Sequence, residues 1–417
     1  MDLSRRQFAL GGLAAFAFRD DTLKVLSSLS KQTAGPTDEK FWTELRNAFY
    51  IPTDLTVFNN IGLAPPPKAV VEAQERETKR AAADPSFYIW RRQDHELEPI
   101  RSDLAAFIGC SVEELALTMN ATYGLQTTIL GLDLQPGDEI LATSHEYPRI
   151  HTAIEQRVLR DKVVFKKVEL GPHALTDDEL VSKITGAVTE KTKLVVLSRI
   201  SYLIGQILPI RTIAAFLEKR NILLLVDTAQ SIGLLDDKMS DLLCPVQVAC
   251  LHKWVMGPIG TGVMVVKKPF IEKIWPLHPA DDDLKKDITK FEQVGTHPAA
   301  PFLALKESLE LHHRLTALAK RERLIYLRNR LAEKILNIPG AVQYGSLDPK
   351  VCLPMLTVGF PKITPPQLAS QLMSEFKIHV TTAVRADVNG IRISPNVFTT
   401  TEEVDLLAKA ITELTKK

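Results

Sequence analysis

The feature that most constrains the fold is a regular alternation of short apolar runs with segments of helical spacing. The apolar runs lie at residues 114–119, 139–142, 163–168, 194–197 and 222–226. Segments of about 10–15 residues with helical spacing separate them, and this alternation predicts a mostly parallel sheet covered by helices on both faces. Ligands of such α/β sheets bind beyond the carboxyl ends of the strands. Polar residues that directly follow a strand are therefore the first candidates for a site.

The pattern changes after Gly295, where a second, smaller unit is expected. Residues 301–336 read as a long charged helical stretch, and three short strand candidates follow at residues 355–360, 379–383 and 390–394. This mixture predicts an α+β domain at the C-terminus. The predicted organisation is a signal and linker at 1–34, a large domain with an N-terminal arm at 35–298, and a small domain at 299–417.

The N-terminus carries two arginines, Arg5 and Arg6, in the run Ser-Arg-Arg-Gln-Phe before a short apolar segment. This order is typical of a twin-arginine export signal. We therefore expect export to the periplasm by the twin-arginine route. The alternative is an N-terminal extension that is never cleaved on a cytoplasmic protein.

Composition and cysteine usage exclude several function classes. The 417 residues carry a net charge of +1, which gives no reason to expect a nucleic-acid partner. No stretch after the N-terminus reaches the roughly 18 apolar residues of a membrane span. Cys110, Cys244, Cys250 and Cys352 form no CxxC pair and no cluster with histidines, so no metal site is expected.

The acid at the end of one apolar run is the first candidate for chemistry. Asp227 follows the run 222–226, so its carboxylate is expected to be buried and to need a partner. A protonated pyridine nitrogen is such a partner, and Gln230 could reach the phenolic oxygen of the same ring. A structural ion pair or a helix N-cap is the alternative for Asp227.

A lysine and a helix start complete the pattern. Lys253 lies between His252 and Trp254, and a lysine that forms a Schiff base needs a pKa lowered by burial and nearby cations. Without the neighbouring motifs, Lys253 would be interpreted as a surface lysine in a loop. Asn120-Ala121-Thr122 opens a helix directly after a strand, where backbone amides can bind a phosphate, although a plain N-cap is the alternative. Together these residues favour pyridoxal phosphate (PLP).

The ordered motifs resemble the class V aminotransferases, a family of fold-type I PLP-dependent enzymes, and within it the isopenicillin N epimerase-like branch. The resemblance covers residues 40–417. The matching motifs are Asp227–Gly233, His252-Lys253-Trp254, the glycine-rich run 257–262, Asn59-Asn60-x-Gly62, Asn120-Ala-Thr122, Gly295-Thr296 and Ile391–Ser394. It implies a large domain built on a mostly parallel sheet and a smaller α+β C-terminal domain.

The resemblance also implies roles for the cofactor side of the site. Lys253 would carry the Schiff base and move the α-proton, Asp227 would pair with the pyridine nitrogen, and Gln230 would bond the phenolic oxygen. The phosphate would be held by Asn120, Ala121, Thr122 and His252. Thr296 is similar to a residue that crosses a dimer interface to the partner's phosphate, which implies a homodimer with shared active sites.

On the substrate side, the resemblance implies that Arg392 binds the carboxylate of an amino-acid substrate. Tyr147 would stack on the cofactor ring, with His145 as the weaker candidate, and Asn60 would line the substrate side. The chain departs from the family at Ser198-Arg199, at Ile204-Gly205 and at Cys250. Arg199 is therefore either a second anion-binding residue or part of a surface ion pair. Arg91, Arg92 and Arg385 are further candidates for a second carboxylate clamp.

Cysteine desulfurases of this family carry a catalytic cysteine shortly before the Arg-x-Ser strand, and residues 381–390 contain none. The expected activity is therefore a PLP-dependent reaction at the α-carbon of an amino acid, with aminotransfer preferred. An amino-acid epimerase and a C–S or β-lyase are the alternatives within the family. A sensor with the same fold but without turnover is the alternative from another class, and the intact Lys253, Asp227 and Arg392 argue against it.

Overall fold

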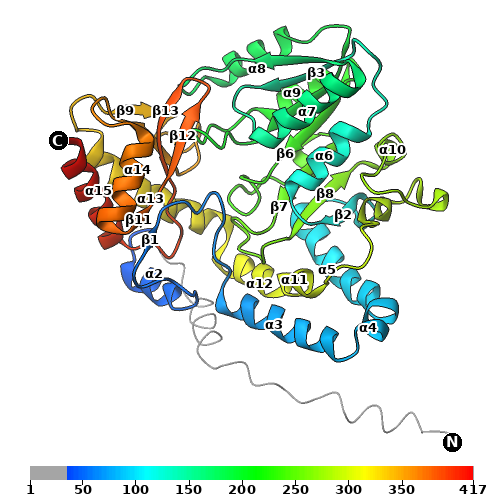
Figure 1. Ribbon diagram of the computed structural model, residues 1–417, viewed down its shortest axis with the longest axis horizontal. Helices are drawn as coiled ribbons and strands as arrows, with labels where there is room; N and C mark the ends of the chain where they lie inside the picture. The colour runs from blue at the N-terminus through cyan, green and yellow to red at the C-terminus, as the bar shows by residue number, and fades with distance from the viewer. Residues whose placement is uncertain (1–34, 417) are drawn as a thin grey trace, which may run out of the picture.

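The computed structural model describes residues 35–416, shown in Figure 1. The predicted export signal and linker at 1–34 lie outside the described residues, so localisation stays a prediction. Within the described range, none of the helices has both the length and the apolar character needed to cross a membrane.

A seven-stranded sheet forms the core of the larger unit. Its strands are β2 (Leu115–Thr118), β3 (Glu139–Thr143), β4 (Val164–Val168), β5 (Thr192–Ser198), β6 (Leu223–Asp227), β7 (Val246–Cys250) and β8 (Gly262–Val266). Their order is β2-β8-β7-β6-β5-β3-β4, and only β8 runs against its neighbours β2 and β7. The predicted mostly parallel α/β sheet is therefore confirmed.

Side-chain alternation along the central strands explains why helices cover both faces. Leu223 and Leu225 of β6 pack into one apolar cluster with residues of α6 (Ala121–Gly131) and α7 (Pro148–Asp161). Leu224 and Val226 point the other way, into a cluster with α8 (Asp177–Gly186) and α9 (Ile210–Glu218). Strands that are apolar on both faces need two covering layers, as the unbroken run at 222–226 indicated.

Further helices lie outside these two layers, and some of them line the bottom of Figure 1. They are α2 (Glu39–Arg46), α3 (Lys68–Ala83), α4 (Pro85–Arg91), α5 (Gln93–Ile108), α10 (Lys268–Ile271), α11 (Ala300–Leu303), α12 (Leu305–Leu315) and α13 (Ala317–Ile335). The stretch predicted as one long helix at 301–336 is thus three helices. Thr316 breaks it with φ 56° and ψ 156°, and its side chain caps α13 by accepting from the Ala319 amide.

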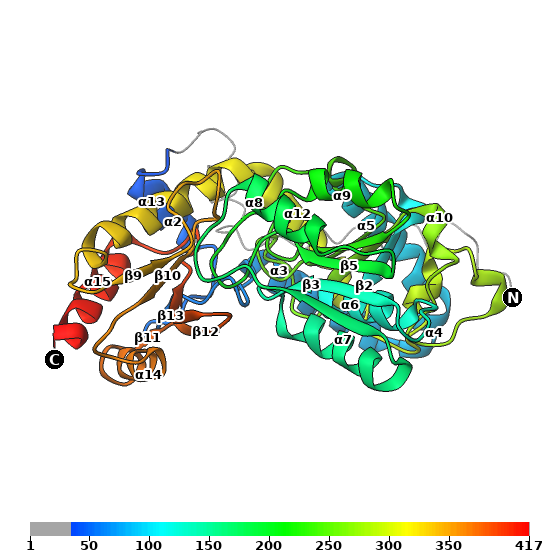
Figure 2. The ribbon, with the colours of Figure 1, turned by 90° about the horizontal axis from the view of Figure 1, so that it is seen from above.

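The smaller unit contains a four-stranded antiparallel sheet, β12-β13-β10-β9. Its strands are β9 (Val342–Tyr344), β10 (Leu356–Gly359), β12 (Thr381–Arg385) and β13 (Val388–Ile393), covered by α14 (Pro365–Phe376) and α15 (Thr401–Lys416). Figure 2 shows this unit at one end of the molecule and the larger sheet at the other. The three predicted C-terminal strands are confirmed.

The N-terminal arm connects the two units. β1 (Thr56–Val57) pairs in parallel with β11 (Ile378–His379), and Arg46 of α2 forms an ion pair with Glu403 at 2.7 Å. The chain then runs from the small sheet toward the large one through residues 58–67. The predicted domain limits at 34/35 and 298/299 stay predictions.

Candidate functional site

Asp227 lies at the carboxyl end of β6, where the sequence places it. Its carboxylate is buried, and Oδ1 accepts a hydrogen bond of 2.9 Å from the Ala229 amide. Burial raises the pKa of the Asp227 carboxyl, whereas the nearby Lys253 ammonium and the Ala229 amide oppose that rise. The two residues predicted to carry the chemistry are therefore close enough to influence each other's charge.

Lys253 lies in a tight turn just beyond β7, a strand that the sequence analysis missed. The turn is closed by hydrogen bonds from the Met256 amide to the Lys253 carbonyl (3.1 Å) and from the Gly257 amide to the Leu251 carbonyl (2.9 Å). Met256 adopts a left-handed conformation with φ 58°, which a non-glycine residue tolerates only where its surroundings hold it. The turn therefore presents Lys253 in one fixed orientation next to the end of the sheet.

A buried lysine of α13 supports this turn. Lys320 of α13 donates to the Trp254 carbonyl at 2.7 Å and contacts Nδ1 of His312 at 2.9 Å. Burial lowers the pKa of Lys320 to about 7. Lys320 thus bonds to the carbonyl of Trp254, the residue after Lys253. Sequence reasoning gave Lys320 no role because it lies 67 positions downstream on a helix rich in lysine and arginine.

Gln230 has a different set of contacts from the one predicted. Its side-chain oxygen accepts from the Trp254 indole at 3.1 Å, and its nitrogen donates to the Ile61 carbonyl at 3.1 Å. Its amide therefore joins the Lys253 turn to the N-terminal arm. A bond to a phenolic oxygen would have to use the one amide hydrogen that remains.

The N-terminus of α6 lies against the end of β7. Asn120 is the N-cap, accepting from the Tyr123 amide at 2.9 Å, and the Ala121 amide donates to the Cys250 sulfur at 3.3 Å. No residue within 35–416 accepts from the Thr122 amide between them. Gly262 permits this approach, because a Cβ there would lie 2.6 Å from the Asn120 Cα. The N-cap is confirmed, and free N–H groups at a helix start suit a phosphate.

His252 and Cys250 complete this corner of the site. The His252 ring is buried with no partner for Nδ1 among the described residues, and burial together with the Lys253 charge lowers its pKa to about 4. Burial raises the pKa of the Cys250 thiol. Both groups are therefore neutral near pH 7, and His252 offers a hydrogen bond without charge.

Arg392 lies on β13, and its guanidinium is buried. It donates to the Tyr202 carbonyl at 2.9 Å and to the Asn59 side-chain oxygen at 3.1 Å, and it lies over the Tyr202 ring at 5.8 Å. Its Nε has no partner, and no carboxylate within the described chain forms an ion pair with it. A buried cation without a counter-charge is costly, as its pKa lowered to about 10 by burial indicates. Such a group is suited to bind an anion.

The segment 59–64 brings Arg392 and Lys253 into one site. Asn59 contacts Arg392, the Ile61 carbonyl accepts from Gln230, and the Ala64 amide donates to the His252 carbonyl at 3.3 Å. Asn60, the residue predicted to line the substrate side, is fully buried and donates to the Val57 and Ser394 carbonyls. Asn59, its neighbour, contacts the substrate-side arginine instead.

Tyr147 is available for stacking, whereas His145 is not. Tyr147 is 41% exposed and lies edge-on to Tyr202 with ring centroids 5.9 Å apart. His145 is buried, and its Nδ1 lies 3.3 Å from the Ser201 hydroxyl. Of the two candidates, the structure leaves only Tyr147 with an open ring.

Glu146 is a site residue that the sequence analysis missed. It is fully buried and accepts from the Ser198 hydroxyl (2.5 Å), the Ser198 amide (2.7 Å) and the Thr143 hydroxyl (2.6 Å). Burial raises its pKa to about 7, and the charge of Asp227 adds to the rise. The carboxyl groups of Glu146 and Asp227 are therefore both buried and close to each other. Its position directly before the predicted ring-stacking Tyr147 was the only signal in the sequence.

The side chains of two further candidates make no contact with this cluster, although the Arg199 amide donates to the Asp227 carbonyl at 2.8 Å. Arg199 forms an ion pair with Asp237 at 2.6 Å, so the structure matches the surface ion pair and gives no support to a second anion site there. Thr296 is exposed, and none of its contacts within the described chain reaches the Lys253 turn. Its predicted contact across a dimer interface stays a prediction.

The cysteines do not form a nucleophilic site. Cys244, Cys250 and Cys352 are buried, Cys110 is partly so, and burial raises the pKa of all four thiols. Where a cysteine-bearing loop would be expected, β12 and β13 are joined by the two-residue turn Ala386-Asp387, both with positive φ. This geometry leaves no loop to carry a thiol into the site.

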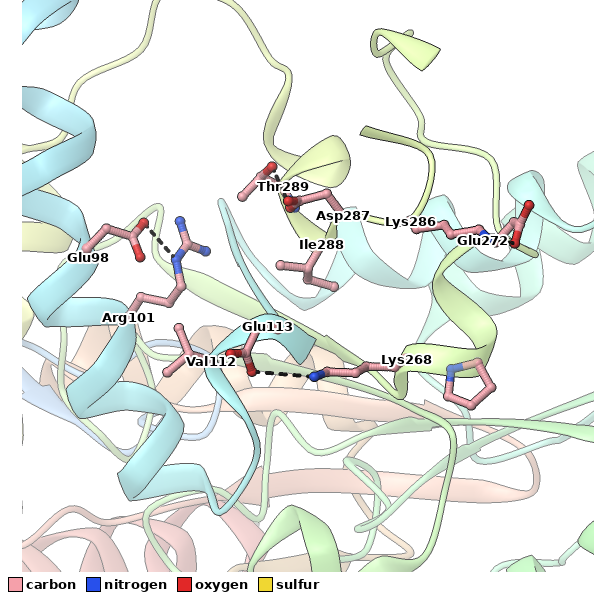
Figure 3. Close-up of a pocket in the computed structure, with 11 residues that line it drawn as sticks. Glu98, Arg101, Val112, Glu113, Lys268, Glu272, Lys286, Asp287, Ile288 and Thr289 are labelled. Carbon is pink, nitrogen blue, oxygen red and sulfur yellow. Dashed lines mark hydrogen bonds and ion pairs between the residues drawn. The ribbon is translucent and has the colours of Figure 1, made fainter. Parts of the chain in front are cut away.

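The structure also contains a cavity of about 740 Å³ away from these residues, shown in Figure 3. Most of its charged groups are already paired: Arg101 with Glu98, Lys268 with Glu113, and Lys286 with Glu272. Asp287 accepts from the amide and the hydroxyl of Thr289. None of the predicted site residues lines it. Among residues 35–416 no group of three or more His, Cys, Asp or Glu side chains could hold a metal ion.

Residues 57–407 match the model of a family described as "Aminotransferase class-V". The chain is 25% identical to an isopenicillin N epimerase of Streptomyces clavuligerus, over 90% of this chain and 98% of that one. It is also 25% identical to a probable cysteine desulfurase of Pyrococcus abyssi, over 89% and 97%. A mutant of C-DES with glycine covalently linked to its PLP cofactor matches with TM-score 0.77 and 23% identity, over 88% and 99%.

Proposed function

The chain belongs to the class V aminotransferase family of PLP-dependent enzymes, and we propose that it acts at the α-carbon of an amino acid. PLP supplies an aldehyde that links to amines and a ring that accepts electrons. The residues present fit it. The Thr122 amide, which donates to no residue within 35–416, and the neutral His252 ring would bind the phosphate of the cofactor. Asp227 would pair with the protonated ring nitrogen of the cofactor. Tyr147 offers an open ring face for stacking.

The remaining steps are assigned to this chain's own side chains. The Lys253 amine would form the link with the cofactor and then, once released, accept the α-hydrogen at Nζ. The turn that fixes Lys253, supported by Lys320, keeps that nitrogen in place. Arg392 would bind the substrate carboxylate and so orient the α-carbon toward Lys253.

The observation that carries this proposal is the buried, unneutralised guanidinium of Arg392. The same short segment, 59–64, contacts both Arg392 and His252 beside Lys253, so it places the cation and the Lys253 turn at its two ends. Arginine's planar fork matches a carboxylate with two parallel hydrogen bonds. An α-amino acid presents a carboxylate and an amine on one carbon, which suits such a pair.

We propose aminotransfer as the outcome of α-hydrogen removal. Epimerisation is the second candidate, because relatives that match nearly the whole chain include two named isopenicillin N epimerase. A β-lyase shares the same first step. A persulfide mechanism is disfavoured, since all four thiols are buried or partly buried with raised pKa values. A sensor without turnover is disfavoured because Lys253, Asp227 and Arg392 are all in place.

The test is exchange of the α-hydrogen with solvent. Purified protein reconstituted with PLP should wash deuterium from D₂O into the α-position of at least one amino acid, as followed by proton NMR. The methyl ester of the same amino acid, which lacks the carboxylate that Arg392 binds, should exchange roughly 100-fold more slowly. A keto acid that accumulates with an amino acceptor indicates aminotransfer, and a racemised substrate indicates epimerisation. No exchange with any amino acid would contradict the proposal.

We also propose that the protein is a homodimer with shared active sites. Met119 and Ile259 are 50% and 66% exposed, and both line a hollow of about 250 Å³ with His297, one residue after Thr296. Exposed apolar residues around a hollow favour a protein contact, and this one adjoins the phosphate corner at Asn120. We expect sedimentation equilibrium to give twice the mass of the chain and Ile259→Glu to shift it toward one chain. A wild-type protein of single-chain mass would exclude the dimer.

A further inference from the structure

A second arginine reaches the substrate side from the same hairpin as Arg392. Arg385 ends β12, and Arg392 lies on β13. In the register of this pair Thr381 lies opposite Arg392, and Arg385 lies opposite Val388. Directly opposed residues of an antiparallel pair share a face, and so do alternate residues of one strand. Arg385 and Arg392 therefore project from the same face of the hairpin, about 13 Å apart along it.

That face packs against the loop that carries Tyr202. Ala383 and Val388 of the hairpin contact Leu203 and Ile204, and Tyr202 packs beside them. Arg392 lies over the Tyr202 ring, and burial raises the pKa of the Tyr202 hydroxyl while the nearby charges of Arg385 and Arg392 oppose that rise. Both guanidinium groups thus lie near one tyrosine, whose ring also makes a T-shaped contact with Tyr147.

Arg385, like Arg392, has no counter-charge. Its guanidinium donates a hydrogen bond of 2.5 Å to Nδ1 of His151. His151 is held by its other nitrogen, which bonds the Thr143 carbonyl at 2.8 Å, so it presents a lone pair to Arg385 and no negative charge. Burial and the Arg385 charge both lower the His151 pKa, which keeps that ring neutral. No carboxylate within residues 35–416 forms an ion pair with Arg385.

Several other arginines of the described range differ from this pair, although the buried Arg328 also lacks an ion pair with a carboxylate. Arg46, Arg101, Arg199 and Arg330 each have a carboxylate partner within the described range. Arg385 and Arg392 instead place two uncompensated positive charges around Tyr202. Like charges held together in a half-buried place are unfavourable unless an anion joins them. Because the hairpin register separates the two strand positions by about 13 Å, one carboxylate bound at Arg392 leaves Arg385 without an anion.

We propose that Arg385 is a specificity-determining residue that binds a second carboxylate, at the far end of the side chain of an acidic amino-acid substrate. The proposal rests on the proposed function, because it assigns the α-carboxylate to Arg392. Four of the five N–H donors of Arg385 are not used by His151, and the Tyr202 hydroxyl lies beside them. A side-chain carboxylate would therefore meet charged and neutral donors together. The substrate class is thus a dicarboxylic α-amino acid.

The experiment compares matched substrates on the PLP-loaded enzyme. Amino acids with one, two and three methylenes before a terminal carboxylate are each assayed beside their terminal amides, by α-hydrogen exchange and by kcat/KM. The wild type should favour the carboxylate in at least one pair by roughly 100-fold, since a buried charge-assisted contact is lost with the amide. Arg385→Gln should reduce that ratio to below about tenfold while leaving the amide's kcat/KM within about threefold.

Control variants separate specificity from structure. Arg385→Lys keeps the positive charge but lacks the planar guanidinium that can donate two parallel hydrogen bonds. It should retain part of the preference for the carboxylate substrate. Arg220→Gln removes an exposed arginine at the end of α9 and should leave the ratio unchanged. If Arg385→Gln slows both members of a pair equally, Arg385 only joins the two units and the proposal is overturned. If the wild type has the same kcat/KM for the amides as for the carboxylates, the proposed substrate class is wrong, whereas the proposed PLP-dependent reaction is still supported. If no amino acid exchanges at all, the proposed function itself has failed.

Discussion

Replacing Lys253 with alanine is expected to abolish the covalent link between protein and cofactor and to lower turnover by roughly 10⁴-fold. The variant removes both the amine that forms the link and the base that takes the α-hydrogen. Asp227, His252 and the start of α6 remain, so the variant should still bind PLP without a covalent bond. Borohydride reduction followed by mass spectrometry of the tryptic peptides measures the link directly.

Lys320 is the competing assignment, and the same experiment separates the two lysines. Its pKa of about 7 would suit a nucleophilic amine, but Lys320 is only 1% exposed and its nitrogen is already bonded to the Trp254 carbonyl and His312. We therefore expect the reduced adduct on the peptide that contains Lys253, both in the wild type and in Lys320→Met. Lys219→Ala, at an exposed helix end, serves as the neutral control. An adduct on Lys320 would contradict the assignment.

The large sheet could be predicted from the sequence because its strands are apolar on both faces. The run 222–226 predicts β6, observed at Leu223–Asp227, and Asp227 follows from it. β7 was missed because Gln247 interrupts its apolar residues, and that amide is buried only because it donates to the Met239 carbonyl at 2.7 Å. Local hydrophobicity cannot predict that a polar side chain is buried when its hydrogen-bond acceptor is the carbonyl of a residue outside the strand.

The candidate site was predicted where a residue's role depends on its neighbours in the chain. Asp227, Lys253 and Asn120 each lie at the end of an element, and the structure brings them together. Residues whose role depends on distant contacts could not be assigned in the same way. Glu146 reads as an exposed acid before a proline-started helix, yet the ends of β3 and β5 enclose it. Arg385 and Arg392 share a face only through the register of a hairpin.

The fully buried Glu146 makes stability depend on pH in a direction that can be worked out. Its folded pKa of about 7 lies above the ordinary value of 4.5, so the folded protein keeps a proton that the unfolded chain loses. The contribution of Glu146 is therefore fully present below about pH 4.5 and is lost as pH rises through about 7. A shift of about 2.5 units corresponds to about 3 kcal/mol of unfolding free energy.

Glu146→Gln mimics the protonated group and should remove this dependence. Its unfolding free energy relative to the wild type, measured by urea denaturation, should rise by up to about 3 kcal/mol between pH 4.5 and pH 8. Glu218→Gln, at an exposed position on α9, should follow the wild type throughout. Because the charge of Asp227 adds to the rise in the Glu146 pKa, Asp227→Asn should lower the pH at which the wild-type loss occurs. If the unfolding free energies of Glu146→Gln and the wild type changed with pH in parallel, Glu146 would ionise as readily in the folded protein as in the unfolded chain. Its three hydrogen bonds would then fully replace the lost contacts with water, which contradicts the prediction.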